Sequence, residues 1–205
     1  MRNKSTVGVG KKLITSSVAV FILFCALLSI PIGSYAGGDV FIPSFGVGKT
    51  NVRIYTDYFC PPCRAMEPRL DPIISKLIKD GIINLTFIDT PFYRHSALYA
   101  RYFLYALNEN TDMEHALTVR KFLTEAANKR VGSAGELEDI LRTKNVAIKP
   151  FDTQPTFNTL SGYLKNDEIN ATPTCIIEIN GKKERYTGAD EIINALNNLK
   201  KELKK

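Results

Sequence analysis

Two cysteines separated by two residues stand between a strand pattern and a helix pattern. Residues 52–56 alternate weakly and carry β-branched and aromatic side chains, which predicts a strand. Over residues 66–79 the apolar side chains recur at spacings of three and four, which predicts a helix with one buried face. Cys60 and Cys63 therefore lie where this strand leads into this helix. Because residues 82–88 predict another strand, the motif falls inside a strand–helix–strand unit, which is typical of α/β folds.

The later patterns complete an α/β order. They predict, in chain order, a strand over 82–88, a helical block over about 94–164, strands over 175–179 and 182–186, and a helix from residue 190. Asn180-Gly181 is a strong two-residue hairpin signal between the last two strands. No catalytic constellation is found in the helical block. A Gly-rich lead-in segment, residues 37–50, precedes the first strand and offers an edge strand.

Residues 1–36 have the layout of a secretory signal peptide. An apolar run over 13–30 follows four basic residues, and no acidic residue occurs before Asp39. Small side chains at Ser34 and Ala36 predict cleavage before Gly37. The alternative is an amino-terminal membrane anchor, because 18 apolar residues are near the lower limit for a membrane span.

The charge balance excludes some partners once this segment is set aside. The chain has 27 Lys and Arg against 21 Asp and Glu, a formal net charge of +6. Four of the basic residues lie before residue 37, which leaves 23 against 21, or +2. So small a charge gives no reason to expect nucleic acid as a partner. The cysteines that remain, Cys60, Cys63 and Cys175, are too few for a disulfide-stapled scaffold.

The spacing of Cys60 and Cys63 suits thiol–disulfide exchange. In such a pair one sulfur forms the mixed disulfide and the other lies close enough to resolve it. The first cysteine opens a helix, where unpaired backbone N–H groups and the helix dipole favour a thiolate. We therefore expect Cys60 to be the nucleophile and Cys63 the resolving cysteine. Pro61 suits the first helical turn because it needs no N–H partner there, and Pro62 stiffens the loop between the sulfurs.

Two simpler explanations of the pair stay open. One is a structural disulfide between Cys60 and Cys63. The other is half of a zinc site, for which Cys175, His95 and His115 are the remaining ligands and match no zinc motif. Cys175 lies in an apolar strand, where a buried inert thiol is expected. Surface or capping roles are expected for the two histidines.

The chain resembles the thioredoxin superfamily, specifically its exported DsbA-like and DsbC/DsbG-like branch. Three features carry the resemblance, which covers residues 50–205: the Cys60–Cys63 motif at a helix start, Pro68 five residues after it, and residues 171–174, Ala-Thr-Pro-Thr, before a strand. It implies a thioredoxin-like domain over residues 51–205, with a helical insertion between a βαβ half and a ββα half. It also implies that Thr172-Pro173 is a cis peptide facing the cysteines and, with Pro61 and Pro62, contacts an extended substrate chain.

The direction of electron flow is less constrained by the motif. Pro62 occupies a place where DsbA-like oxidases typically have a histidine, which argues against the most oxidising extreme. Ile54 occupies the place of a buried acid that assists proton movement in thioredoxins. Asp57 is a candidate proton shuttle, and the alternative for it is a solvated loop acid. Asp57 and Thr172 resemble the DsbC/DsbG catalytic domain, but residues 37–50 are too short for the dimerisation domain of those isomerases.

Together these features predict a thiol:disulfide oxidoreductase, an oxidase or isomerase acting on protein thiols and disulfides in the periplasm or another extracytoplasmic compartment. The expected partners are protein or peptide substrates and a membrane or soluble redox partner. Neither a cofactor nor a metal nor nucleic acid is expected. The alternatives are a dedicated disulfide reductase, for example in cytochrome maturation, and a redox-inert peptide-binding chaperone module.

Overall fold

The computed structural model describes residues 40–202, so the signal peptide or anchor predicted for residues 1–36 lies outside the described residues. No helix in this described part is long and apolar enough to cross a membrane. Its elements, in chain order, are β1 (Ser44–Phe45), β2 (Thr50–Thr56), α2 (Pro61–Lys79), β3 (Ile83–Asp89), α3 (Ser96–Leu107), α4 (Met113–Asn128), α5 (Ala134–Thr143), α6 (Gln154–Asn166), β4 (Thr174–Ile179), β5 (Lys182–Thr187) and α7 (Ala189–Glu202). This is the α/β order that the sequence patterns predict.

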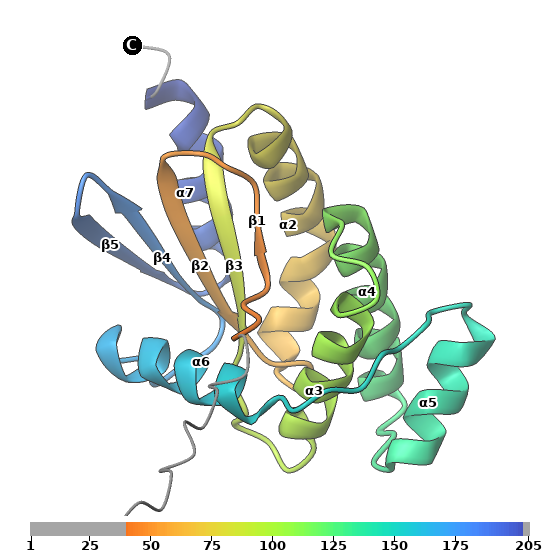
Figure 1. Ribbon diagram of the computed structural model, residues 1–205. Coiled ribbons are helices and arrows are strands. Elements are labelled where there is room, and N and C mark those ends of the chain that lie inside the picture. The colour runs from red at the N-terminus through yellow and green to blue at the C-terminus, as the bar shows by residue number, and fades with distance from the viewer. Residues whose placement is uncertain (1–39, 203–205) are drawn as a thin grey trace, which may run out of the picture. The chain divides into compact units, whose positions relative to one another are not determined.

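The five strands form one mixed sheet in the order β1-β3-β2-β4-β5 (Figure 1). The central strands β2 and β3 are parallel, as their connection through α2 requires. The pairs β2 with β4 and β4 with β5 are antiparallel. β5 follows β4 through a two-residue turn whose residues Asn180 and Gly181 both have positive φ, 51° and 79°. The lead-in segment adds β1, which pairs antiparallel with β3 at the sheet edge.

The alternation along β2 separates two cores on the two faces of the sheet. Val52 and Ile54 join the larger core, which also contains the buried faces of α2, α3, α4 and α7. Tyr55 joins a smaller cluster on the other face, together with Leu160 of α6 and Ile176 of β4. Figure 1 accordingly shows α6 on one side of the sheet and α2 and α7 on the other.

Helix α2 positions the cysteine pair on the larger core. Its side chains at positions 63, 66, 70, 74 and 77 are buried, which matches the predicted apolar face. The helix begins at Pro61, contains Pro68 and Pro72, and ends at Lys79; Asp80 is its C-cap residue, and the next residue, Gly81, has a φ of +68°. A continuous buried stripe therefore fixes how the first turn, with the cysteines, meets the sheet.

The helical insertion contains one helix more than the sequence patterns distinguish. Apolar spacing predicts segments that correspond to α3, α4 and α5. The fourth helix, α6, lies within the predicted block, but it buries only Thr156 and Leu160, so its periodic signal is weak. It packs on the smaller cluster, where few apolar contacts are needed to hold one helix.

Candidate functional site

Cys60 lies at the junction between β2 and α2. It is the N-cap residue of α2, with extended φ and ψ of −77° and 114°, and Pro61 and Pro62 occupy the first helical positions. The Cys60 N–H donates a hydrogen bond to the Asp57 carbonyl oxygen at 3.1 Å, which closes the turn before the helix. The Cys60 side chain therefore takes the place at the helix N-terminus where a negative charge is favoured.

The two sulfurs of the motif are in direct contact and have opposite acidities. Cys60 Sγ and Cys63 Sγ are 2.6 Å apart, and both residues are buried, 2% and 1% exposed. The hydrogen bond from Cys63 lowers the pKa of the Cys60 thiol to about 6, although burial acts against it. The same contact and burial raise the pKa of Cys63 well above its ordinary value. Cys60 is thus the sulfur that ionises first.

The segment before β4 lies beside Cys60, with the backbone geometry that the family resemblance implies. The Thr172-Pro173 peptide bond is cis. The Thr172 carbonyl oxygen lies 3.3 Å from Cys60 Sγ, and the Pro173 carbonyl oxygen accepts a hydrogen bond from the Gly188 N–H at 2.9 Å. Pro173 itself is buried and Thr172 is half-buried. The structure therefore brings this segment to Cys60.

Asp57 is not the solvated loop acid that was considered as an alternative, because it is only 2% exposed. One carboxylate oxygen accepts a hydrogen bond from the Phe59 N–H at 2.7 Å. The other accepts from the Phe92 N–H at 3.1 Å and from the Ser96 hydroxyl at 2.6 Å. Asp57 therefore ties the turn before Cys60 to the β3–α3 loop.

With this geometry in place, a family model described as Thioredoxin matches residues 47–197. The chain belongs to the thioredoxin family. No match is found among the curated proteins. Membership of this family, together with the cysteine pair at the start of α2, supports thiol–disulfide exchange as the general chemistry of the site.

Solved structures of other proteins share the fold of this chain. Proteus mirabilis ScsC in a transitional conformation is 23% identical, with a TM-score of 0.63 over 81% of this chain and 74% of that chain. A periplasmic thioredoxin-like protein from Salmonella enterica serovar Typhimurium is 21% identical, with a TM-score of 0.60 over 95% and 100% of the two chains. The thiol-disulfide exchange protein alpha-DsbA2 from Wolbachia pipientis is 23% identical, with a TM-score of 0.55 over 80% and 88%. The predicted thioredoxin-like fold is thereby confirmed.

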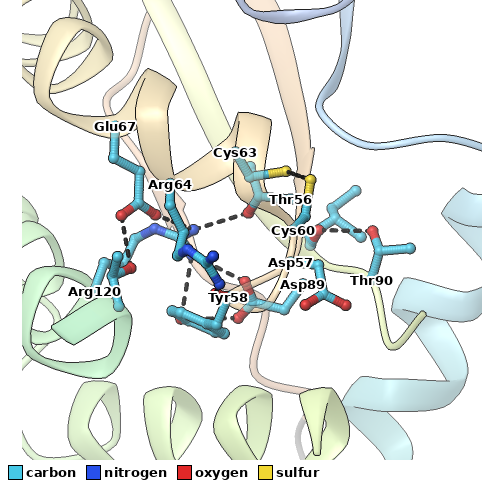
Figure 2. A network of polar contacts seen from close by, with 12 residues as sticks. Thr56, Asp57, Tyr58, Cys60, Cys63, Arg64, Glu67, Asp89, Thr90 and Arg120 are labelled. Carbon is cyan, nitrogen blue, oxygen red and sulfur yellow. Dashed lines mark hydrogen bonds and ion pairs between the residues drawn. The ribbon is translucent and has the colours of Figure 1, made fainter. Parts of the chain in front are cut away.

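A buried arginine of the helical insertion organises the base of this thioredoxin-family site. Arg120, 3% exposed, forms ion pairs at 2.9 Å with Glu67 of α2 and with Asp89 at the end of β3. It also donates hydrogen bonds to the Thr56 hydroxyl at 2.8 Å and to the Tyr58 hydroxyl at 3.3 Å. Figure 2 shows this network directly beside the turn that leads to the cysteine pair. Its partners therefore bracket the motif in sequence, before Cys60 and after Cys63.

The sequence interpretation missed this network, because it assigned no site residues to the helical block. The sequence did contain a signal of this network. Arg120 lies four residues after Ala116 and three before Leu123, on the buried face of α4. A charged residue on an apolar helical face requires buried partners of opposite charge, and these come from elements distant in sequence.

Cys175 is an inert thiol, and the two histidines contact groups other than the reactive sulfurs. Burial raises the pKa of the Cys175 thiol to about 12, which leaves it protonated and unreactive at neutral pH. His115 Nε2 lies 3.3 Å from the Ala106 carbonyl oxygen, and the His95 ring packs 6.1 Å from that of Phe59. Within residues 40–202, no three His, Cys, Asp or Glu side chains gather as metal ligands would.

Proposed function

We propose that this chain is a thiol:disulfide oxidoreductase of protein substrates, with Cys60 as nucleophile and Cys63 as resolving cysteine. The observation that carries the proposal is the opposite shift of two pKa values in touching sulfurs, lowered at Cys60 and raised at Cys63. At pH 7 most of a thiol with a pKa of about 6 is thiolate, whereas an ordinary cysteine is mostly protonated. The pair is therefore prepared for attack by one defined sulfur.

The exchange proceeds in two balanced steps. The Cys60 thiolate attacks one sulfur of a substrate disulfide, which forms a mixed disulfide and releases the other substrate sulfur as a thiolate. Cys63 then loses its proton and attacks Cys60 Sγ, which forms the Cys60–Cys63 disulfide and releases the second substrate thiolate. Two electrons pass from the pair to the substrate. Run in reverse, the same steps oxidise a substrate dithiol and reduce the pair.

The second step requires Cys63 to become a better acid. Its pKa is raised chiefly by its hydrogen bond to Cys60, and that bond to an anion disappears once Cys60 is in a mixed disulfide. Asp57 is the candidate acceptor for the released proton, because it is a buried carboxylate whose charge acts on Cys60. Its three hydrogen bonds also hold the turn, so it is at the same time a positioning residue.

The substrate chain is proposed to lie in extended form across Thr172 and Pro173 and against the exposed Pro61 and Pro62. The contact between the Thr172 carbonyl and Cys60 Sγ supports this, because a strand laid along residue 172 passes directly beside the reacting sulfur. The two prolines add rigid apolar surface that loses little conformational entropy on binding.

An oxidase or isomerase is the proposed direction. The lowered pKa of Cys60 marks a stabilised thiolate, which favours the reduced pair and hence oxidation of substrates. Equilibration of the pair with glutathione measures this directly. A potential near about −120 mV indicates an oxidase, and one near about −270 mV indicates the alternative, a dedicated reductase.

Export completes the proposal. Removal of residues 1–36 as a signal peptide would release a thioredoxin-like domain of residues 51–205, with its lead-in segment, into an oxidising compartment. The similar protein of Salmonella enterica is described as periplasmic, which supports this location. Protease protection in intact cells, with mass measurement of the mature amino terminus, separates a cleaved signal from a retained anchor.

Single cysteine variants test the enzyme assignment. Cys60→Ser is expected to abolish reduction of insulin and disulfide-coupled refolding of a reduced protein. Cys63→Ser is expected to trap a mixed disulfide with the substrate. Cys175→Ser is the matched control and is expected to keep full activity. A Cys60→Ser variant that retains both activities would contradict the role of Cys60 as nucleophile. A wild type that assists refolding but does not reduce insulin would support the redox-inert chaperone module.

A further inference from the structure

A pocket of about 510 Å³ opens beside the cysteine pair. Three segments line it: the start of α2, the β3–α3 loop and the end of α4. Its lining residues are Phe59, Arg64, Tyr93, Arg94, His95, Ala127, Asn128 and Arg130. Phe59 directly precedes Cys60 in sequence, and the Arg64 N–H donates to the Cys60 carbonyl oxygen at 3.2 Å. One lining residue, Phe59, is therefore the immediate neighbour of the reacting cysteine in sequence.

The lining is basic without a compensating acid. It contains three arginines and one histidine, and none of its eight residues is acidic. Arg64 donates one hydrogen bond to the Tyr58 carbonyl oxygen at 3.3 Å. Arg94 and Arg130 are exposed, and across the described part of the chain neither forms an ion pair with a carboxylate. The positive charge of this pocket is thus free to attract an anionic group.

Arg130 occupies a backbone position that glycine normally takes. Its φ is +58°, directly after the end of α4. The Arg130 N–H bonds the Ala127 carbonyl oxygen and the Val131 N–H bonds the Ala126 carbonyl oxygen, the pattern of a Schellman helix end. An L side chain is disfavoured at this left-handed position, and here it carries a guanidinium into the pocket lining.

Aromatic side chains give the pocket walls and rim. Phe59 packs edge-on against Tyr99, with ring centroids 4.8 Å apart, which fixes the wall nearest Cys60. The lining residue Tyr93 is 47% exposed, and its neighbour in sequence, Phe92, is 48% exposed, unusually open for large hydrophobic residues. Burial and the charge of Cys60 raise the pKa of Tyr93, so this ring lies within electrostatic reach of the reacting sulfur. Arginine beside exposed aromatic rings is a composition typical of binding hot spots.

We infer that this pocket selects substrates that carry a carboxylate next to their reacting cysteine. The inference rests on the proposed function and names its substrate class: protein segments with Asp or Glu beside the cysteine, or the carboxylates of glutathione as a second source of the same chemistry. Guanidinium groups bind carboxylates with two parallel hydrogen bonds, and the aromatic walls reduce competition from water. The substrate that fits is acidic close to its sulfur.

Three matched peptide disulfides test the inference by their kcat/KM values. They differ only at the residues flanking the cysteine, which are Asp, Asn or Lys, and glutathione disulfide forms a fourth arm. The wild type is expected to prefer Asp over Asn, with each arginine contributing about 2- to 5-fold. In the double variant Arg94→Gln/Arg130→Asn the preference is expected to fall by the product of the two factors. Asn is chosen at position 130 because it tolerates positive φ.

Lys129→Gln is the matched control, because it removes one exposed positive charge beside Arg130 but outside the lining. Equal rates for Asp and Asn peptides in the wild type, together with an unchanged rate for glutathione disulfide in the double variant, would overturn the inference, as would an equal loss in Lys129→Gln. A loss confined to glutathione identifies the small thiol as the source, and a loss confined to the peptides identifies protein segments.

A cysteine-free acidic peptide separates this inference from the proposed function. Its binding is expected to be weaker in the double variant and at high salt, as measured by isothermal titration calorimetry. If no disulfide reacts but this peptide binds through the arginines, the proposed function is wrong and the assignment of the pocket as a carboxylate-binding site is supported. If the disulfides react and neither sequence nor salt alters binding, the pocket assignment fails alone.

Discussion

Arg53 and Arg120 are two buried arginines on opposite faces of strand β2. Arg53 belongs to this strand, and Arg120 contacts its last residue, Thr56. Arg53, in β2, donates to Asp167 at 2.7 Å and to Glu178 at 3.2 Å, on the face covered by α6. Arg120, in α4, reaches the other face, where the cysteine pair lies. Both arginines have carboxylate partners, because a buried guanidinium is tolerated only when carboxylates surround it.

The difference between them lies in what their partners hold. Asp167 is the C-cap residue of α6, so the Arg53 cluster attaches the end of a helix to the sheet. Glu67 and Tyr58 stand on either side of the cysteine motif, so the Arg120 cluster fixes the turn that presents Cys60. The same chemistry therefore serves stability at one face and, in addition, positioning of a reactive sulfur at the other.

Arg120→Met gives the largest expected effect. The substitution leaves Glu67 and Asp89 buried without their cation, so the free energy of unfolding should fall by about 3–5 kcal/mol. Urea denaturation measures this loss, and the pH dependence of Cys60 alkylation should shift with it. The triple variant Arg120→Met/Glu67→Gln/Asp89→Asn should recover part of the stability. A loss below about 1 kcal/mol would show that the cluster is not a structural centre.

Arg53→Met should cost less, about 2–3 kcal/mol, because Asp167 keeps Lys183 at 2.8 Å. Alkylation of Cys60 should still follow a midpoint near pH 6, since none of the contacts of Arg53 involves the motif. The comparison of the two arginines breaks down if Arg53→Met moves this midpoint as far as Arg120→Met does.

The Asp57→Asn variant tests whether the charge of a carboxylate near the cysteine pair acts directly on the Cys60 sulfur. The Asp57 carboxylate raises the pKa of Cys60, so its removal should move the alkylation midpoint to lower pH. The amide should also lose one of three buried hydrogen bonds, at a cost of about 1–2 kcal/mol. Ser96→Ala, which removes one donor and no charge, should destabilise the chain without moving the midpoint.

The smallest expected effect is the difference in the pH dependence of stability between the wild type and Asp167→Asn. Burial alone would raise the pKa of Asp167, but hydrogen bonds from Arg53, Lys183 and Tyr55 lower it overall. A lowered pKa contributes stability above the unfolded value of about 3.9, and this is lost as pH falls through the folded value. Wild-type stability should therefore drop in acid more steeply than that of the variant. Equal slopes in urea titrations would contradict this.

Local patterns in the sequence were sufficient to predict most of the architecture. The strands and α2 follow from alternation and from spacings of three and four, and Asn180-Gly181 specified the hairpin between β4 and β5. The exception is α6, which buries only two of its side chains and so lacks a strong period. Where a helix is held by few contacts, periodicity gives little warning of it.

The site was predicted in its sulfur chemistry but not in its surroundings. Cys60 at a helix start predicted a reactive thiol, and its pKa of about 6 agrees with that expectation. The burial of Asp57 depends on donors from Phe92 and Ser96, which lie about 35 to 39 residues away. No local pattern encodes such pairings, because they form only when the β3–α3 loop meets the turn before α2.

The sequence by itself determined the order of elements, the cysteine pair at a helix N-terminus and the Thr172-Pro173 segment, because each depends on neighbours within a few residues. Tertiary structure alone decided which charges are buried and where the arginine pocket opens. Those properties arise where distant segments meet: Arg120 with Glu67 and Asp89, and the end of α4 with the β3–α3 loop, which line the pocket together. Their energies depend on burial, which only packing creates.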